Sequence, residues 1–134
     1  MAEKDTILYF DDEQTILELA EIHFKKNFPT HQLYLRRGKR RPIKQIISSV
    51  GGIERIAIIC TDGSLLETFK GWDLVRELRN NGYNGHAIYT GHCGLEKEDR
   101  PLFDAVINKD KWGELIETMK GYLSQNKPIL PLKI

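Results

Sequence analysis

Four charged residues each follow a short apolar run of the sequence: Asp11, Asp12, Asp62 and Lys109. The runs span residues 7–10, 56–60 and 105–107. Apolar runs of this length, separated by helical patterns, are typical of buried parallel strands. Because the carboxyl ends of parallel strands meet at one edge of an open sheet, we expect the four side chains to converge there. Carboxylates and an ammonium group at one edge predict a site for a divalent cation and a phosphoryl group.

The acidic pair Asp11-Asp12 indicates which divalent cation the predicted site would bind. Adjacent carboxylates repel each other unless a cation neutralises them, and hard oxygen ligands suit Mg²⁺. Asp62, on a neighbouring strand, is then suited to act as a nucleophile that forms an acyl phosphate. Taken singly, the pair could cap a helix, Asp62-Gly63 could mark a turn, and Lys109 could be a surface lysine. Their coincidence favours the site.

The composition of the whole chain limits the class of protein. The 134 residues, 40% hydrophobic and 29% charged, predict one globular domain. A net charge of +1 argues against a nucleic-acid binder. Cys60 and Cys93 have neither metal-ligand spacing nor a disulfide framework, so we expect reduced thiols. The sequence shows no signal-peptide pattern and no stretch long enough to cross a bilayer, so the expected location is the cytoplasm.

Strand and helix patterns alternate five times along the chain. Strands are expected over residues 7–10, 32–35, 56–60, 86–89 and 105–107. In the first helix, residues 14–26, one face is expected to hold Ile16, Leu19, Ala20, His23 and Phe24. The charged segment 94–103 contains Pro101 and predicts only one or two helical turns. The alternation implies an α/β fold, a doubly wound five-stranded parallel sheet with helices on both faces.

Together these motifs resemble the response-regulator receiver family over about residues 6–124. Four segments carry the resemblance in the family's order: residues 7–13, 56–62, 87–91 and 105–109. The resemblance implies a flavodoxin-like strand order, 2-1-3-4-5, in a receiver domain of residues 1–126 with a tail of residues 127–134. The tail is apolar and broken by proline.

The resemblance also implies a role for each site residue. Asp62 would accept phosphate from a histidine kinase or a histidine phosphotransfer protein. Asp11, Asp12, Asp62 and the backbone carbonyl of Ser64 would hold Mg²⁺, Lys109 would pair with the phosphoryl oxygens, and Thr90 would move to hydrogen-bond the new phosphate. The chain would then catalyse only its own phosphorylation and dephosphorylation, and would not be an enzyme for another substrate. It would signal by protein contact as a monomer or weak dimer, with no membrane or nucleic-acid partner.

The sequence departs from the family at several points. The lysine is followed by Asp110 rather than proline, and Val106 stands where the family often has an aromatic residue. The loop over residues 63–70 lacks a methionine-proline turn, and a short interval between Thr90 and Lys109 trims the fourth helix, so that it is expected to be short or irregular. We therefore expect normal receipt of phosphate and a different readout.

Other interpretations remain open. The chain could be a pseudo-receiver, an interaction module that is not phosphorylated. Residues 60–65 are similar to the first motif of haloacid-dehalogenase-type phosphatases, but Cys60 stands in place of the nucleophilic aspartate. A transition-metal site at His86, His92 and Cys93 is disfavoured, because adjacent ligands chelate one ion poorly. The basic segment 36–41 is interpreted as a solvated loop rather than a patch for an acidic partner, since no aromatic residue interrupts it.

The resemblance yields one prediction for the lifetime of the phosphorylated form. In the family, the side chains two residues beyond the phosphoacceptor and two beyond the switch hydroxyl tune dephosphorylation. These are Ser64 and His92 here. Substituting both is expected to change the hydrolysis rate of the acyl phosphate, measured as loss of the phosphorylated mass with time. An unchanged rate would contradict this assignment.

Overall fold

The structure is a computed structural model that describes residues 4–37, 43–63, 65, 70–91 and 94–126. The strands are β1 (Thr6–Asp11), β2 (Gln32–Arg37), β3 (Ile56–Thr61), β4 (His86–Tyr89) and β5 (Ala105–Val106). The α-helices are α1 (Gln14–Asn27), α2 (Ile43–Ser49), α3 (Gly71–Asn80) and α4 (Trp112–Asn126), and the 3₁₀ turns are η1 (Ile53–Arg55) and η2 (Arg100–Leu102). None of these helices has the length and apolar character that a membrane span requires. The tail of residues 127–134 lies outside the described residues.

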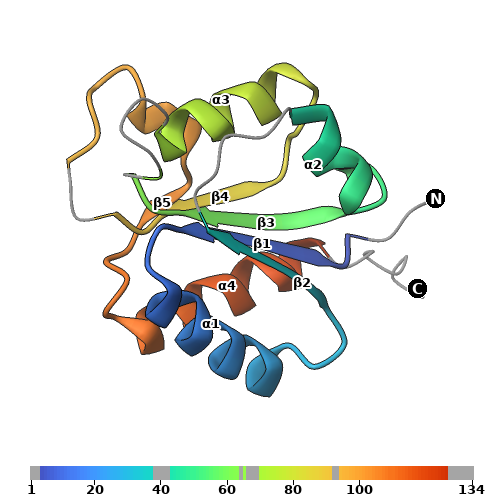
Figure 1. The fold of residues 1–134 in the computed structure, drawn as a ribbon, viewed down its shortest axis with the longest axis vertical. Helices are drawn as coiled ribbons and strands as arrows, with labels where there is room; N and C mark the ends of the chain where they lie inside the picture. Colours follow the sequence, from blue (N-terminus) through green and yellow to red (C-terminus); the bar gives the residue numbers. More distant parts are fainter. Residues whose placement is uncertain (1–3, 38–42, 64, 66–69, 92–93, 127–134) are drawn as a thin grey trace, which may run out of the picture.

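The five strands form one parallel sheet in the order β2-β1-β3-β4-β5, which confirms the predicted fold. Helices α2 and α3 cover one face of the sheet, and α1 and α4 cover the other (Figure 1). Because both faces are covered, every residue of the central strands β1 and β3 is buried. The edge strand β2, by contrast, buries only Tyr34. Parallel pairing brings the carboxyl ends of the strands to one edge of the sheet.

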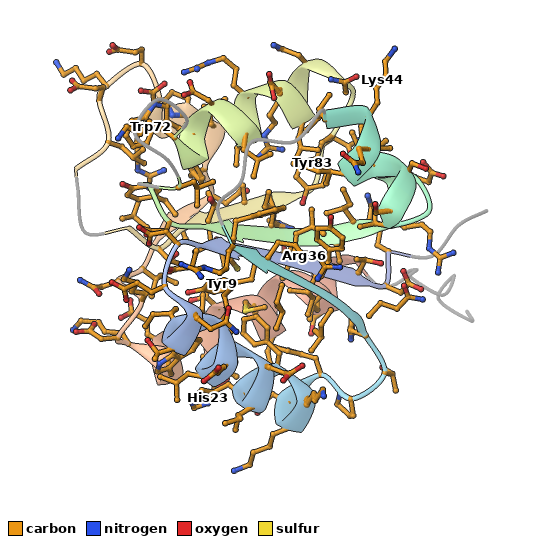
Figure 2. All side chains as sticks on the ribbon, viewed as in Figure 1. Tyr9, His23, Arg36, Lys44, Trp72 and Tyr83 are labelled. Carbon is orange, nitrogen blue, oxygen red and sulfur yellow. The ribbon has the colours of Figure 1, made fainter. Side chains whose placement is uncertain are left out.

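The sheet separates two apolar layers. Leu8, Phe10 and Tyr89 belong to the layer under α2 and α3. Tyr9 and Cys60 belong to the layer under α1 and α4. Figure 2 shows Tyr9 and Tyr83 on opposite sides of the sheet. This alternation follows from the two-residue period of a strand, and it places consecutive residues of β1 in different layers.

The predicted inner face of α1 is wrong at one position, because Leu19 is 42% exposed. The residues that α1 buries are Leu17, Ala20 and Phe24, at spacings of three and four. The sequence of α1 carries two overlapping apolar stripes, so its periodicity alone does not decide which stripe faces the sheet. His23 is only half-buried, and its ring stacks on Trp112 of α4 with centroids 4.8 Å apart.

Between β4 and β5, the described residues contain no α-helix and only the short turn η2, as predicted. Two arginines of α3 hold this segment. Arg79 donates to the backbone carbonyl of Leu102 at 2.8 Å, and Arg76 forms an ion pair with the buried carboxylate of Asp99. Backbone and acidic groups that would be unpaired in an irregular segment therefore find partners on α3.

The start of α3 packs against the chain just after β3. A methyl group on Gly71 would overlap the backbone carbonyl oxygen of Asp62 and would lie 2.6 Å from Oγ1 of Thr61. The Gly71 N–H also donates to the carbonyl of Gly63 at 2.9 Å. The absence of a side chain at Gly71 thus allows the start of α3 to lie directly against the backbone of Asp62 and Gly63.

This close approach predicts opposite effects for two glycine substitutions. Gly71→Ala is expected to lower the free energy of unfolding by about 1–3 kcal/mol, because the backbone of Asp62 must move. Gly121→Ala is the control: Gly121 lies in α4 with no atom within 4 Å of the added carbon. It is expected to raise the free energy of unfolding by up to about 1 kcal/mol, because alanine favours helix. Urea denaturation measures both, and equal effects would contradict the assigned contact.

Candidate functional site

The structure brings together the predicted residues that it describes. Asp11 ends β1, Asp62 follows β3, Thr90 follows β4 and Lys109 comes three residues after β5. Backbone hydrogen bonds continue the strand pairing to this edge: the N–H of Asp62 donates to Phe10, and the N–H of Thr90 donates to Thr61, both at 2.9 Å. The positions of Asp62 and Thr90 are therefore fixed by the sheet.

Three carboxylates converge at this edge. Asp11, Asp12 and Asp62 each offer an oxygen atom within 4.8 Å of the others. Asp11 and Asp62 are buried, and Asp12 is exposed. Oδ1 of Asp11 accepts a hydrogen bond from the N–H of Glu13 at 2.8 Å, whereas its Oδ2 has no hydrogen-bond partner among the described residues. The cluster therefore includes a buried acceptor atom that is available to a ligand.

Helix capping does not account for the acidic pair. The N-cap residue of α1 is Glu13, and its side chain makes no capping hydrogen bond. Asp12 lies one residue before the cap, with its side chain exposed. The simpler interpretation of the pair as an N-cap is thus wrong for Asp12.

Lys109 is the cation of this cluster. Its Nζ lies 3.5 Å from Oδ2 of Asp62, 3.6 Å from Oδ2 of Asp11 and 3.6 Å from Oε2 of Glu13. Burial alone lowers the pKa of Lys109, but the three carboxylates outweigh it, and the pKa is raised. Sequence reasoning missed Glu13, although its place directly after the acidic pair was a signal that could have identified it.

One lysine does not balance the buried acids. Burial raises the pKa of Asp11 to about 7, and the charge of Asp62 adds to this, while the N–H of Glu13 and the charge of Lys109 act in the opposite direction. Burial also raises the pKa of Asp62, against the effects of Lys109 and the N–H of Gly63. A divalent cation would supply the missing positive charge. Three carboxylate oxygens, one of them exposed, fit the oxygen ligands and retained waters of Mg²⁺.

Thr90 lies at the same edge of the sheet, where its N–H donates to the carbonyl of Thr61, the residue before Asp62. Its side chain is fully buried, and Oγ1 has no hydrogen-bond partner within the described part of the chain. The next residue must be small, because a methyl group on Gly91 would lie 2.6 Å from Oη of Tyr89 and 2.8 Å from the backbone nitrogen of Gly63. A buried hydroxyl without a partner at this edge of the sheet is suited to form a hydrogen bond with a group that binds there.

Other predicted features fall outside the described residues or away from the site. Ser64, His92 and Cys93 are not among the described residues, so their assigned roles stay predictions. Cys60 is fully buried in the layer under α1 and α4, and burial raises the pKa of its thiol. A thiol in this position does not serve as the nucleophile of a phosphatase-like site.

Comparison with known proteins gives matches in structure only. No protein-family model matches the chain, and no curated protein matches significantly. The Francisella response regulator 1452 receiver domain matches with a TM-score of 0.72 and 17% identity, over 92% of this chain and 99% of that one. A receiver protein from Sinorhizobium medicae WSM419 matches with a TM-score of 0.67 and 21% identity, over 94% and 98%. A CheY-like receiver from Methanospirillum hungatei JF-1 matches with a TM-score of 0.67 and 17% identity, over 94% of this chain and 97% of that one. The chain has the receiver fold.

Aromatic residues pack beside β5 on the α3 side of the sheet. Val106, which stands where the receiver family often has an aromatic residue, is 48% exposed. Its partner in the sheet register is Tyr89, which is buried on the α3 side. The ring of Tyr89 packs against Phe103 with centroids 5.4 Å apart and against Trp72 at 6.2 Å. On this face of the sheet, the aromatic side chain next to Val106 is therefore Tyr89 of β4.

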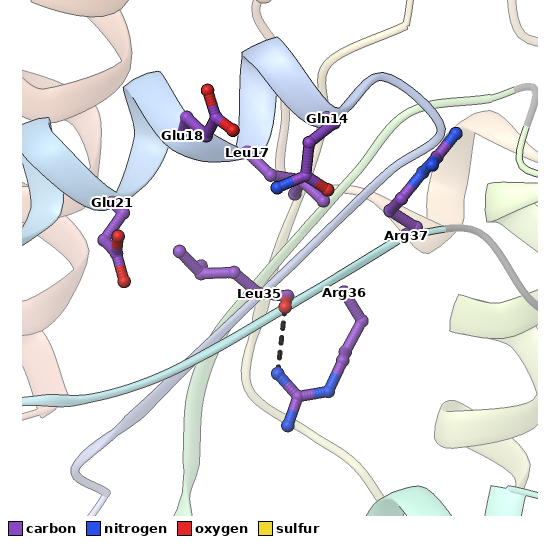
Figure 3. Close-up of a pocket in the computed structure, with 7 residues that line it drawn as sticks. All are labelled: Gln14, Leu17, Glu18, Glu21, Leu35, Arg36 and Arg37. Carbon is purple, nitrogen blue, oxygen red and sulfur yellow. Dashed lines mark hydrogen bonds between the residues drawn. The ribbon is translucent and has the colours of Figure 1, made fainter.

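A groove of about 350 Å³ runs between α1 and β2 of the receiver fold (Figure 3). It is lined by Leu17, Leu35 and charged or polar residues of both elements, and none of the predicted site residues lines it. Arg36 lies over the ring of Tyr34 at 4.0 Å and donates to the carbonyl of Leu35 at 2.9 Å. Arg37 donates to the carbonyl of Asp12 at 3.1 Å. These two arginines make contacts within the chain, while residues 38–41 of the basic segment lie outside the described residues.

The raised pKa of Asp11 predicts a pH effect on stability. Its ordinary value is 3.8, so the folded protein binds this proton more tightly than the unfolded chain does. The resulting stability is complete at low pH and is lost as the pH rises through about 7. Asn at this position cannot ionise. The free energy of unfolding of Asp11→Asn relative to the unmodified protein is therefore expected to rise between about pH 5 and pH 8.

Urea denaturation at a series of pH values, with a chelator present, measures this difference. Asp110→Asn serves as a control, since it removes an exposed aspartate from the same neighbourhood. A constant difference between Asp11→Asn and the unmodified protein across this range would contradict the assigned burial of charge.

Proposed function

We propose that this chain is the receiver of a two-component phosphorelay, and that it accepts a phosphoryl group on Asp62 in a Mg²⁺-dependent reaction. The observation that carries the proposal is the arrangement around Asp62. Its carboxylate lies 3.5 Å from the Lys109 ammonium and shares a cluster with Asp11 and Asp12. The receiver fold places these groups at the edge of the sheet where ligands bind in doubly wound proteins.

The proposed step is transfer of a phosphoryl group from a phosphohistidine. An oxygen of Asp62 forms a bond to phosphorus, and the bond between phosphorus and the donor's ring nitrogen breaks. The donor leaves as neutral imidazole when its other ring nitrogen carries a proton. Burial raises the pKa of Asp62, and the charge of Lys109 acts in the opposite direction, which favours the ionised form that a nucleophile requires. The ammonium of Lys109 also lies close to where the charge of the phosphoryl oxygens collects.

The remaining residues divide the other tasks. Asp11, Asp12 and Asp62 would hold Mg²⁺, which when bound neutralises charge on the phosphoryl oxygens. The backbone N–H of Gly63 donates to Oδ1 of Asp62 at 2.8 Å, which orients the carboxylate. Thr90 offers its unpaired hydroxyl to the new phosphate. The chain acts on itself in this scheme and does not turn over another substrate.

We further propose that the donor is a protein, a histidine kinase or a histidine phosphotransfer protein. The helix that follows the acidic pair, α1, exposes two large apolar side chains: Leu19 is 42% exposed and Ile22 is 64% exposed. Exposed apolar groups next to a reactive site suit contact with a protein surface. The output is then a change in protein contacts in the cytoplasm.

A pseudo-receiver is the second candidate. It is favoured by Glu13, whose carboxylate adds a third acid at 3.6 Å from Lys109, and by the exposed Val106. In this alternative the fold serves protein contact, and Asp62 stays unmodified.

Phosphorylation by a small donor separates the two candidates. The protein incubated with acetyl phosphate and Mg²⁺ is expected to gain the mass of one phosphoryl group. Asp62→Asn is expected to abolish the gain, because the amide is not a nucleophile. Lys109→Met is expected to reduce it, because the counter-charge is removed. Mass spectrometry of the intact protein measures each result.

Asp110→Asn is the matched control, since it removes an exposed aspartate next to Lys109 and is expected to be phosphorylated normally. Omission of Mg²⁺ is expected to prevent the gain. No gain in the unmodified protein, with acetyl phosphate or with a phosphorylated histidine donor, would favour the pseudo-receiver.

A further inference from the structure

Tyr9 presents a polar group in an apolar layer. It is fully buried under α1 and α4, and its hydroxyl has no hydrogen-bond partner among the described residues. Phenylalanine would fill the same space without this cost, since a buried hydroxyl without a partner loses its hydrogen bonds to water. The hydroxyl of Tyr9 therefore requires an explanation.

The sheet register places Tyr9 on the same face as Thr90. Tyr9 pairs with Cys60 in β3, and Cys60 pairs with Ile88 in β4. Thr90 lies two residues beyond Ile88, so its side chain points to the same side of the sheet. Burial raises the pKa of the Tyr9 phenol and the charges of Asp11 and Asp62 add to this, whereas the nearby Thr90 hydroxyl lowers it.

Both hydroxyls are thus buried on the same face of the sheet, and neither has a hydrogen-bond partner within the described residues. Of the polar groups close to the Tyr9 phenol, Thr90 is the one that offers a hydroxyl as partner.

We propose that Tyr9 is a positioning residue for Thr90. In the unphosphorylated protein its hydroxyl pairs with Oγ1 of Thr90, and a phosphoryl group on Asp62 takes Thr90 away from it. This inference rests on the proposed function. Tyr9 sets how easily Thr90 moves, because the pair must break before Thr90 binds the phosphate.

The same residue connects the site to the surface. The ring of Tyr9 stacks near that of Trp112 in α4, with centroids 6.3 Å apart and an angle of 24° between the rings. Trp112 in turn stacks on His23 of α1, with centroids 4.8 Å apart and an angle of 15°. Trp112 and His23 are half-buried. Loss of the Tyr9–Thr90 pair is therefore expected to change the packing of Trp112 and His23 at the surface between α1 and α4. This surface lies on the side of the sheet opposite Trp72 (Figure 2).

Beryllium fluoride with Mg²⁺, a mimic of the phosphoryl group, tests the pairing. Calorimetric titration is expected to show about twofold to tenfold tighter binding in Tyr9→Phe, since one hydrogen bond no longer opposes the movement of Thr90. In a Thr90→Val background, Tyr9→Phe is expected to have no effect on this affinity. A purely structural role for Tyr9 would not produce this dependence on Thr90.

Tyr83→Phe is the matched control. The Tyr83 hydroxyl donates to the carbonyl of His86 at 2.6 Å, in the layer on the other side of the sheet. Its removal also deletes a buried phenol hydroxyl, but it is expected to leave the affinity for the mimic unchanged.

Fluorescence tests the connection to the surface. The chain has two tryptophans, so Trp72→Phe leaves Trp112 as the only one. Binding of the mimic is expected to change Trp112 emission in this variant, and Tyr9→Phe is expected to remove most of the change. Circular dichroism establishes that each variant is folded.

The outcomes separate this inference from the proposed function. If the mimic binds and Asp62 is phosphorylated, but Tyr9→Phe has the same affinity as the unmodified protein, the role of Tyr9 is overturned and the receiver function stands. The role of Tyr9 is also overturned if Tyr9→Phe has an equal effect with and without the Thr90 hydroxyl. If neither the mimic nor acetyl phosphate reacts with the unmodified protein, the proposed function fails and the role of Tyr9 fails with it.

Discussion

The contact between the Lys109 ammonium and the carboxylates around it is the interaction on which the site depends. Asp11, Asp62 and Glu13 all lie within 3.6 Å of Nζ, and two of them are buried. Without the lysine these acids would repel each other in a region with little water to screen them. Even with the lysine, burial and the charge of Asp62 raise the pKa of Asp11 to about 7, so its ionised form is not fully compensated. The negative charge that destabilises this edge of the sheet also favours the binding of a cation there.

Most of the site residues could be predicted from the sequence because they lie at the carboxyl ends of parallel strands. Asp11, Asp62, Thr90 and Lys109 follow apolar runs whose burial the sequence indicates, and parallel pairing brings such positions together whatever the details of packing. The contact of Glu13 with Lys109 was missed, although its place after the acidic pair was a signal; the burial of the Tyr9 hydroxyl depends on packing that the sequence does not show. Leu19 was misplaced for a related reason, since α1 has two apolar stripes and only packing selects between them.

The departures from the receiver pattern are linked through packing. The segment before β5 lacks an α-helix among its described residues, and α3 holds it through Arg76 and Arg79. Tyr89 fills the adjacent layer from β4, while Val106 faces outward. The layer under α1 and α4 contains a second aromatic group, in which Tyr9 and Trp112 lie between the sheet and the surface. Large aromatic side chains therefore flank the site from both faces of the sheet.

The place of Lys109 in the chain has a consequence for how the protein assembles during synthesis. Strand β1 lies between β2 and β3, so the centre of the sheet forms from the first half of the chain. Lys109 follows Asp62 by 47 residues and comes after the last strand. A nascent chain that has already paired β1 with β3 carries an acidic edge without its internal counter-ion. The carboxylates of that edge gain the charge of Lys109 only once residues 105–109 have joined the sheet.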